Sequence, residues 1–216
     1  MRGLIVADWL AYRRRMGSVS MYFSYLVCVV CFLVWPETIA LSLITLVILP
    51  MGMANLPVVL KEIDSGQAYC RYLLTLPCGK RDIVRARFAA SLLDGLQDMG
   101  LALVFILVHA AWKHMYSWAE YLQLWLGCVM IGISYMAVNL LVSFAGNVMV
   151  SSVFYMISLL AGVGIYLVVF LLDVPVERIL SASPVVLWLA AGMVTVGILA
   201  ACYGISLRIF GRRSVA

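Results

Sequence analysis

The sequence predicts an all-α protein that crosses a membrane several times. Of its 216 residues, 65% belong to the hydrophobic set and only 12% are charged, and the mean hydropathy is +1.08. Soluble domains are roughly half apolar, so this composition excludes a water-soluble globule. Six apolar runs each supply the roughly 20 residues that a helix needs to cross a hydrocarbon layer about 30 Å thick. We therefore treat residues 1–216 as a single transmembrane domain, with little chain left for a soluble catalytic domain.

The six predicted spans are separated mostly by short connections. They cover residues 19–35, 38–59, 88–112, 118–144, 148–172 and 185–207. Only Pro36 and Glu37 lie between the first two spans, a link so short that it predicts a tight helical hairpin. The connection between the second and third spans, residues 61–87, is much longer and carries the most informative motif in the chain.

Residues 1–16, ahead of the first span, are predicted to form a helix in the membrane interface. Ile5, Trp9 and Tyr12 share one face of that helix, because their spacing follows the helical period. Three consecutive arginines, 13–15, stand at its C-terminal end, where the helix dipole favours cations. A simple membrane anchor is the plainest role for this helix.

Basic residues fall almost entirely on one side of the predicted topology. Thirteen of the fifteen Lys and Arg residues lie before the first span, between the second and third spans, or after the sixth. The other two are Lys113 and Arg178. Because positively charged loops stay in the cytoplasm, both termini and residues 61–87 are predicted to be cytoplasmic. Because the basic residues cluster on one side, the net charge of +5 reflects membrane topology and attraction to anionic lipid, and no nucleic-acid partner is expected. The sequence thus predicts a multi-pass protein of the cell membrane.

The reactive side chains of the sequence do not form a recognisable catalytic or metal site. Cysteine behaves as a small hydrophobic residue inside apolar runs, so neither a disulfide framework nor a metal site is expected. The six cysteines are Cys28, Cys31, Cys70, Cys78, Cys128 and Cys202. Ser134, His109 and His114 are too sparse for an intramembrane serine protease, and no catalytic residue is assigned. Both histidines are expected near the outer end of the third span, as amphipathic residues of the interface.

Residues 61–87 are predicted to contain a short helix on the cytoplasmic face of the membrane. Asp64 or Ser65 can cap its start, and Pro77 ends it because proline cannot continue the hydrogen-bond ladder. A second helix begins near Asp82 and continues into the third span. The first helix carries an apolar and aromatic stripe of Tyr69, Tyr72, Leu73 and Leu76. Such a helix can anchor the loop on the membrane, or it can dock on a cytoplasmic protein and transmit motion to the spans.

The same segment has a distinctive order of residues. The stripe is preceded by an acidic pair, Glu62 and Asp64, and by Gly66. A leucine-rich stretch then ends at Leu76-Pro77. After it, Lys80-Arg81 is followed by Ile83-Val84 and a basic residue. This order resembles the coupling-helix region of the permeases of type-2 ATP-binding-cassette (ABC) transporters. Cys78-Gly79 departs from the Val-Ser or similar pair that is more frequent in that family. Outside residues 61–88, the chain agrees with the family in layout, including the interfacial helix and the very short first outer loop.

The resemblance implies a permease subunit of an exporter, which moves peptides, drugs or other hydrophobic or amphipathic compounds outward by alternating access. It implies ATPase-coupling roles for Glu62, Asp64, Tyr69, Tyr72, Leu73, Leu76, Pro77 and Arg81. The chain lacks a phosphate-binding loop, since Gly79-Lys80 is followed by Arg81 and Leu74 stands where the first glycine should be. ATP and Mg²⁺ are therefore expected on a separate ATPase dimer, with no cofactor and no enzymatic activity in this chain. Six spans are half the usual complement of such exporters, which implies a second copy or a sister permease.

Asp94, Gln97 and Asp98 form a polar cluster within the third predicted span. A charged side chain at the bilayer centre costs about 2.5 to 3.5 kcal/mol on insertion scales, so these residues should face protein or a water-filled path. One hypothesis places them at the cytoplasmic entrance of a substrate pathway, where they attract cations. The other lets them reach cytoplasmic water or pair with a nearby basic residue. Asn55 and Asn139 are candidates for the same pathway or for hydrogen bonds between helices.

Small residues spaced four apart recur on two predicted spans. They are Ser20, Ser24 and Cys28 on the first span, and Ser158 and Gly162 on the fifth. In the resembled family these two spans meet across the dimer, which makes the five residues candidates for a dimer interface. Packing inside one subunit explains the same spacing equally well.

Alternative functions remain open from the sequence. One is a membrane-embedded enzyme that uses Asp94 and Asp98. Another is a haem-exporter-like biogenesis permease of similar architecture, and a third is a scaffold or sensor that transports nothing.

Overall fold

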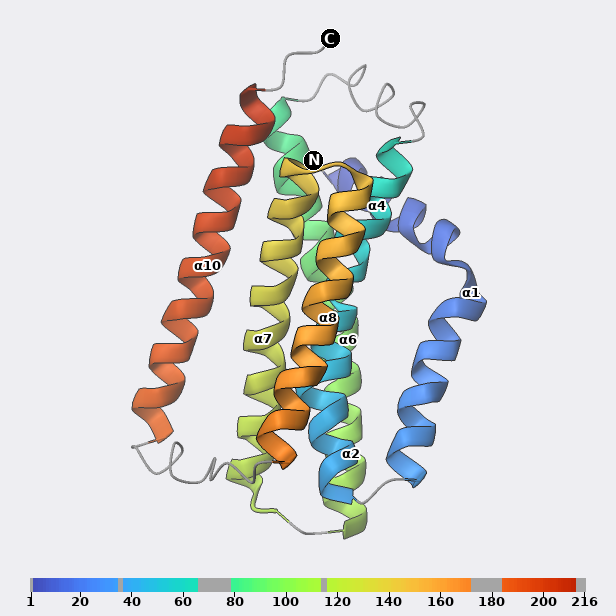
Figure 1. Ribbon diagram of the computed structural model, residues 1–216, viewed down its shortest axis with the longest axis vertical. Helices are drawn as coiled ribbons and strands as arrows, with labels where there is room; N and C mark the ends of the chain where they lie inside the picture. The colour runs from blue at the N-terminus through green and yellow to red at the C-terminus, as the bar shows by residue number, and fades with distance from the viewer. Residues whose placement is uncertain (1, 35–36, 66–78, 114–115, 172–183, 213–216) are drawn as a thin grey trace.

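The fold is a bundle of long helices that run along one axis (Figure 1). The computed structural model describes residues 2–34, 37–65, 79–113, 116–171 and 184–212, and all regular structure within these ranges is helical. The helices are α1 (Arg2–Val34), α2 (Glu37–Leu43), the π-helical turn η1 (Ile44–Ile48), α3 (Leu49–Gly52), α4 (Asn55–Ser65), α6 (Lys80–Lys113), α7 (Trp118–Ala145), α8 (Val148–Leu171) and α10 (Pro184–Arg212). The predicted all-α, polytopic architecture is confirmed.

Five segments of the described chain are long and apolar enough to cross a membrane. They are Ile39–Ser65, Lys80–Lys113, Trp118–Ala145, Val148–Val169 and Val185–Arg212, and they correspond to the second to sixth predicted spans. The first predicted span falls in α1, whose described apolar part is the shorter segment Tyr25–Val34. The protein is thus a multi-pass membrane protein, and its sixth crossing stays a prediction.

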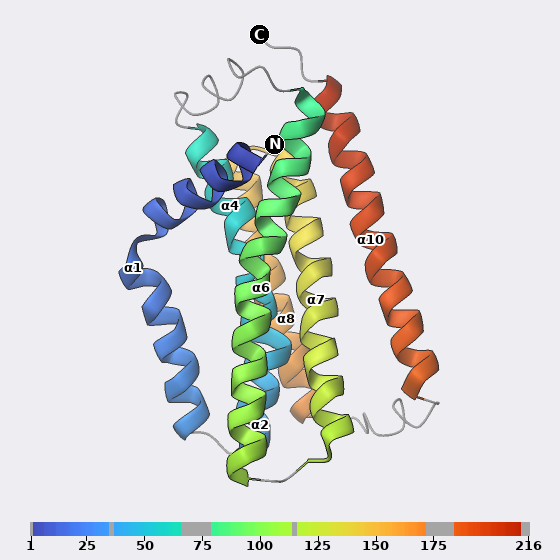
Figure 2. The same cartoon turned by 180° about the vertical axis from the view of Figure 1, so that it is seen from behind.

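The interfacial helix is not separated from the first predicted span. Residues 2–34 form the single helix α1, which bends so that its N-terminal part crosses the end of the bundle beside α4 and α6 (Figure 2). Tyr12 is buried there against Leu56 and Leu60 of α4. The aromatic face predicted for residues 1–16 therefore packs on protein.

The second predicted span, residues 38–59, corresponds to the apolar segment Ile39–Ser65, but its helix is interrupted. The π-helical turn closes with the Leu49 amide donating to the Ile44 carbonyl, directly before Pro50. A tight turn at Met53 and Ala54 then separates α3 from α4. Proline cannot donate a hydrogen bond, and its ring clashes with the carbonyl four residues earlier. For Pro57 that carbonyl belongs to Met53, where the helix stops.

Both described ends of the chain lie at the same end of the bundle (Figures 1 and 2). The end of α4, the start of α6 and the turn between α7 and α8 are found there too, so residues 61–87 begin and end beside the termini. The start of α2 and the junction of α6 with α7 lie at the opposite end. This arrangement agrees with the predicted grouping of termini and loop, while their cytoplasmic side stays a prediction.

α6 begins at Lys80, as predicted for the second helix of the loop. Asp82 lies in its first turn, and the amides of Asp82 and Ile83 both donate to the Gly79 carbonyl. The helix then continues without interruption to Lys113. Asp64 and Ser65, in contrast, do not begin a helix, since they end α4 and the Ser65 hydroxyl donates to the Glu62 carbonyl at 2.6 Å. Any helix between residues 66 and 78 lies outside the described residues.

His109 lies in the core, which corrects the interfacial position expected for it. Its ring is 1% exposed, and its Nδ1 lies 2.8 Å from the Tyr121 hydroxyl. It also stacks on Tyr116 and meets the edge of Phe32. The sequence does not show these aromatic partners because they come from three different segments. His114 lies outside the described residues.

Candidate functional site

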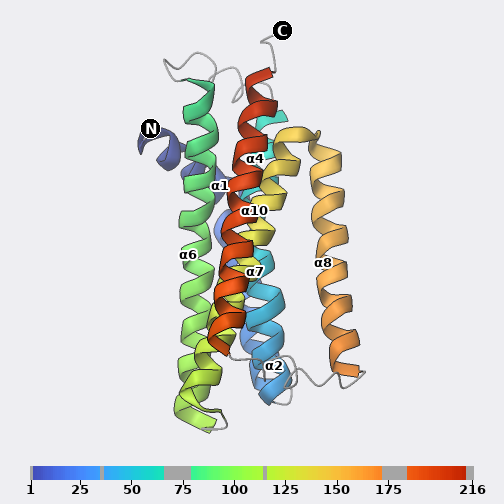
Figure 3. The ribbon, with the colours of Figure 1, turned by 90° about the vertical axis from the view of Figure 1, so that its left-hand side faces the viewer.

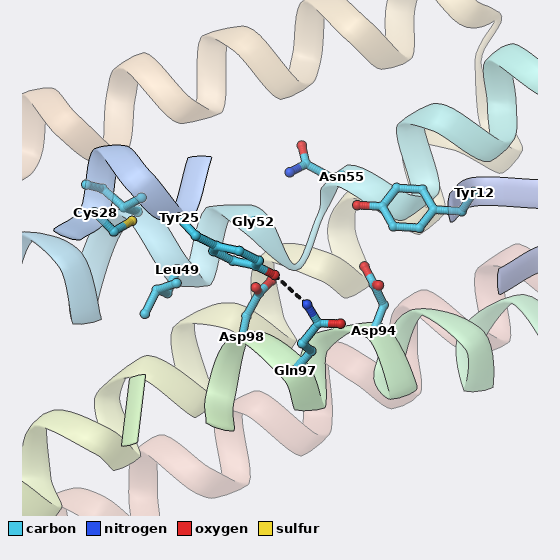
Figure 4. A pocket seen from close by; sticks show the side chains of 10 residues that line it. Tyr12, Tyr25, Cys28, Leu49, Gly52, Asn55, Asp94, Gln97 and Asp98 are labelled. Carbon is cyan, nitrogen blue, oxygen red and sulfur yellow. Dashed lines mark hydrogen bonds between the residues drawn. The ribbon is translucent and has the colours of Figure 1, made fainter. Parts of the chain in front are cut away.

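A polar cavity of about 70 Å³ opens inside the bundle, between α1, α3, α4 and α6 (Figure 4). Both halves of the interrupted second span contribute to its wall, with Leu49 and Gly52 from α3 and Asn55 from α4. The lining residues are Tyr12, Tyr25, Cys28, Ile48, Leu49, Gly52, Asn55, Asp94, Gln97 and Asp98.

Asp94 and Asp98 supply the negative charge of this cavity. They lie one turn apart on α6, and they are only 7% and 8% exposed. Both carboxylates therefore face protein and the cavity. Among the described residues neither forms an ion pair, in contrast to Asp64, which pairs with Arg87. The structure thus brings the acidic pair together without a basic partner.

Gln97 connects α1 with α6 at the edge of the cavity. Its carbonyl oxygen accepts a hydrogen bond from Arg13 Nη2 at 2.7 Å, and its amide nitrogen donates to the Tyr25 hydroxyl at 2.6 Å. Because the Tyr25 hydroxyl accepts this bond, its own hydrogen is donated to the Asp98 carboxyl, which faces it in Figure 4. The guanidinium of Arg13 also lies 4.3 Å from the centre of the Trp9 ring. Arg13 is therefore held by an amide and an indole.

Tyr12 and Asn55 point polar groups into the cavity from α1 and α4. The Tyr12 side chain is 6% exposed, and Figure 4 shows its hydroxyl directed toward Asp94. Burial, and after it the charge of Asp94, raises the pKa of the Tyr12 phenol well above its ordinary value, so the hydroxyl keeps its proton. Within the described part of the chain, neither the Tyr12 hydroxyl nor the Asn55 side chain has a hydrogen-bond partner.

Gly52 allows α3 to approach the acidic pair. A Cβ atom at this position would lie 2.9 Å from Asp98 Oδ2, closer than carbon and oxygen tolerate without bonding. The absence of a side chain at residue 52 therefore leaves the Asp98 carboxyl in its place.

A second group of charged residues lies where α4 ends and α6 begins. Arg87 and Asp64 form a bidentate ion pair, with Nη1–Oδ2 and Nη2–Oδ1 distances of 2.6 Å. Their side chains are 6% and 17% exposed, so water competes little for the pair. It joins the two helices on either side of residues 66–78.

The start of α6 is also bonded to the end of α10. Arg85 Nε donates to the Tyr203 hydroxyl at 3.0 Å, and Lys80 Nζ donates to the Gly211 carbonyl at 3.3 Å. These two helices bound an open groove of about 700 Å³. Its lining includes four basic residues, Lys80, Arg81, Arg85 and Arg208, and one acidic residue, Asp82. The groove is positively charged, as expected near a surface of anionic lipid.

The profile of a family described as "ABC-2 family transporter protein" matches residues 3–211 of the chain. The chain belongs to the ABC-2 transporter family. The resemblance found in residues 61–88 is therefore confirmed over nearly the whole sequence. Neither a curated protein nor a solved structure matches the chain. As an ABC-2 permease, the protein is the membrane component of an ABC transporter, a class that lacks an ATPase motif of its own and typically works with an ATPase partner.

The residues assigned to ATPase coupling in this ABC-2 permease are only partly described. Tyr69, Tyr72, Leu73, Leu76 and Pro77 lie outside the described residues. Glu62 and Asp64 lie in the last turns of α4, and Arg81 is exposed in the first turn of α6 beside the basic groove. The described members thus flank the two ends of the segment.

Four of the five proposed pathway residues meet at one place in the permease. Asp94, Gln97, Asp98 and Asn55 all line the cavity, whereas Asn139 does not. Asn139 is buried in α7, where its Nδ2 donates to the Tyr135 carbonyl at 3.0 Å and its Oδ1 has no hydrogen-bond partner.

The described candidates for a dimer interface face the permease's own helices. Cys28 is buried and lines the cavity. The Ser158 hydroxyl lies 2.7 Å from the Tyr135 hydroxyl of α7. A Cβ at Gly162 would clash with Met51 of α3, 2.0 Å from its methyl carbon. These three positions fit the alternative of packing inside one subunit, while the side chains of Ser20 and Ser24 lie outside the described residues.

Sequence reasoning missed Tyr25, Gly52 and Arg87 as parts of these sites. Tyr25 is a polar side chain inside an apolar run, and Gly52 lies two residues after a proline that breaks the span. Both were signals of an internal site. The partner of Arg87 is 23 residues away, and no local pattern identifies it.

Proposed function

We propose that this ABC-2 permease is the membrane subunit of an exporter, driven by a separate ATPase dimer through the segment between α4 and α6. The family match over residues 3–211 carries the proposal. The described residues on either side of 66–78 support it, since Asp64 and Arg87 join the two flanking helices near the ends of that segment. An ATPase bound there would act on α4 and α6 together.

α4 and α6 would connect that segment mechanically with the cavity. Asn55 begins α4 and Asp64 lies near its end, while Arg87, Asp94 and Asp98 follow one another along α6. α4 and α6 are therefore joined by the ion pair near their ends, and further along the same two helices form part of the cavity wall. Movement of the ion-paired ends as a rigid body would shift the walls of the cavity, as alternating access requires.

The transported compounds are proposed to be peptides, drugs or other hydrophobic or amphipathic molecules. A second copy of the chain or a sister permease would complete the pathway, because the six predicted spans are half of the usual complement. α8 supports this view, since it stands at the side of the bundle against α7 and α4 (Figure 3) and no residue of its most apolar stretch is fully buried within the described chain. Lipid covers the same surface in a monomer.

Affinity purification of the tagged protein from its native membrane in mild detergent tests the proposal. We expect an ATPase chain with a phosphate-binding loop in near-equal amount, with ATP hydrolysis in the purified complex. Tyr72→Ala with Leu76→Ala should leave the permease in the membrane but abolish stimulation of that hydrolysis. Leu122→Ala, at an exposed position near the opposite end of the bundle, is the matched control. Repeated preparations without an ATPase chain would contradict the proposal.

A membrane-embedded enzyme using Asp94 and Asp98 takes second place because the family is one of transport proteins. The cavity favours it in one respect, since two buried carboxylates share a space with a protonated phenol. Preparations that lack an ATPase would make these two aspartates the first residues to substitute. A haem-exporter-like role differs from the main proposal only in the transported compound.

A further inference from the structure

We infer that the cavity between α1, α3, α4 and α6 binds one compact monovalent cation, with the chemistry of an ammonium group. The cation can be the protonated amine of a transported compound, in which case the inference rests on the proposed function, or a free inorganic ion. Both sources would occupy the same oxygen-lined space, and the experiment below distinguishes them.

The first reason is uncompensated charge. Asp94 and Asp98 are both more than nine-tenths buried, and no ion pair joins them to a basic side chain of the described chain. Buried carboxylates are normally paired, because removing a charge from water without a counter-charge is costly. A cation bound between them would supply that counter-charge.

The second reason is independent of the acidic pair. The Tyr12 side chain, on α1, is 6% exposed, and its hydroxyl is directed into the cavity without a hydrogen-bond partner among the described residues (Figure 4). The Asn55 amide, on α4, lines the same space and is likewise without a partner there. Buried polar side chains in proteins are nearly always hydrogen-bonded, so the Tyr12 phenol indicates a ligand or water in the cavity, and the half-buried Asn55 amide borders the same space. Their oxygens add to the carboxylates as acceptors for N–H donors.

The third reason is that the nearby basic side chain is already held. Arg13 is the basic residue whose charge acts on Asp94. Its guanidinium is bonded to the Gln97 carbonyl oxygen at 2.7 Å and lies over the Trp9 ring at 4.3 Å. Gln97 in turn is fixed by Tyr25. Arg13 thus acts on Asp94 only at a distance, and no ion pair with a described basic side chain compensates the acidic pair directly.

The size of the cavity limits the ligand. About 70 Å³ gives room for a few water molecules or one small cation. Apolar side chains and the backbone at Gly52 close the wall opposite α6. An ammonium head group fits this space, whereas the remainder of an amphipathic molecule would have to extend out of it. Carboxylate, phenol and amide oxygens also suit hard cations over soft metals.

Binding of radiolabelled methylammonium to the purified full-length permease in lipid nanodiscs tests the inference. We expect saturable binding of about one cation per chain. Asp94→Asn and Asp98→Asn each keep the shape of the side chain and should weaken binding at least about tenfold, the loss of one charge-assisted interaction. Asp82→Asn on the same helix removes a carboxylate outside the cavity and should leave binding unchanged.

Gly52→Ala tests the cavity with both carboxylates intact. Its new Cβ would intrude on Asp98, so binding should weaken, while Gly100→Ala on α6, which meets no atom within 4 Å, should not change it. Gel filtration establishes that each variant is folded. Absence of saturable binding in the wild type, or equal binding in the wild type and both asparagine variants, would overturn the inference.

Competition identifies the source of the cation. If a large excess of K⁺ or Na⁺ fails to displace methylammonium, the site is selective for an amine, as a substrate site should be. If either ion displaces it at equal concentration, the cavity is a site for an inorganic cation. Binding to the permease alone needs no ATPase. If the wild-type permease transports with ATP but does not bind methylammonium, only this inference is overturned. If it binds methylammonium but no ATPase co-purifies with it, only the proposed function is overturned.

Discussion

Arg87 and Asp64 form a bidentate ion pair, with two nitrogen to oxygen distances of 2.6 Å, although 23 residues separate them in the sequence. The pair joins the end of α4 to the first turns of α6. It also lies under the aromatic ring of Phe144, whose centre is 5.8 Å from the Arg87 guanidinium carbon. The ion pair thus fixes the described helix ends on either side of residues 66–78 to each other.

Replacing Arg87 by Gln should destabilise the permease and uncouple it from its ATPase. We expect a loss of about 3 kcal/mol in the free energy of unfolding, the lower end of the range for breaking a buried pair, because Asp64 is 17% exposed. Arg87→Lys keeps the charge but not the two parallel bonds, so its loss should be smaller. Denaturant unfolding in detergent measures both variants. Arg85→Gln, at an exposed position with one bond to Tyr203, is the control, and an equal loss in this control would contradict the assignment.

Gly52→Ala should destabilise the permease, although the substitution adds only one methyl group. The new Cβ would lie 2.9 Å from Asp98 Oδ2, so α3 or the carboxyl must shift. Overpacking of this kind costs about 1 to 3 kcal/mol. Thermal unfolding measures the loss, and Gly100→Ala, which meets nothing within 4 Å, provides the comparison. Equal stability of the two variants would show that α3 does not approach α6 as closely as described.

Gln97→Leu should loosen the contact between α1 and α6. It removes the acceptor for Arg13 and the donor for Tyr25 together, and because Arg13 is exposed and Tyr25 half-buried, each lost hydrogen bond should cost about 0.5 to 1.5 kcal/mol. Limited proteolysis of the N-terminal part of α1 should become faster. Leu96→Ala, at the exposed neighbouring position, should leave the proteolysis rate unchanged. An unchanged rate in Gln97→Leu would argue against this link.

Ser117→Ala should affect stability alone. The Ser117 side chain accepts a hydrogen bond from the Glu120 amide, and the Glu120 side chain accepts one from the Ser117 amide, which together cap the start of α7. Loss of such a cap costs about 1 kcal/mol. The free energy of unfolding should fall by that amount, while transport and ATP hydrolysis should stay unaltered. A transport defect would show that this end of the bundle contributes to function.

Hydropathy and basic residues predicted the helical architecture well. The predicted spans from 88 onward agree with α6, α7, α8 and α10 within a few residues at most ends, because long apolar runs have few alternatives in a membrane. The second predicted span corresponds to Ile39–Ser65, and Pro50 and Pro57 give the physical reason why its helix is interrupted. The turn at Met53 and Ala54 is buried against α6 and α7, and no local pattern contains that information.

The polar residues of the cavity were predictable in part. Asp94, Gln97, Asp98 and Asn55 stood out because polar side chains are costly in a membrane. Their assembly with Tyr12 and Tyr25 depends on how α1 packs against α4 and α6, which the sequence pattern does not specify. The Arg87–Asp64 pair was hidden for the same reason, since the Asp64 side chain was expected to cap a helix start.

The most direct test of the central claim is photo-crosslinking in intact cells, with a photoreactive amino acid at residue 76 or, as a control, at residue 118. Leu76 belongs to the proposed coupling segment, and Trp118 is 71% exposed at the opposite end of the bundle. We predict that residue 76 crosslinks to a chain with a phosphate-binding loop and that residue 118 does not. A failure of residue 76 to crosslink to any ATPase, or equal crosslinking at both positions, would contradict the claim that an ATPase drives this permease through the segment between α4 and α6.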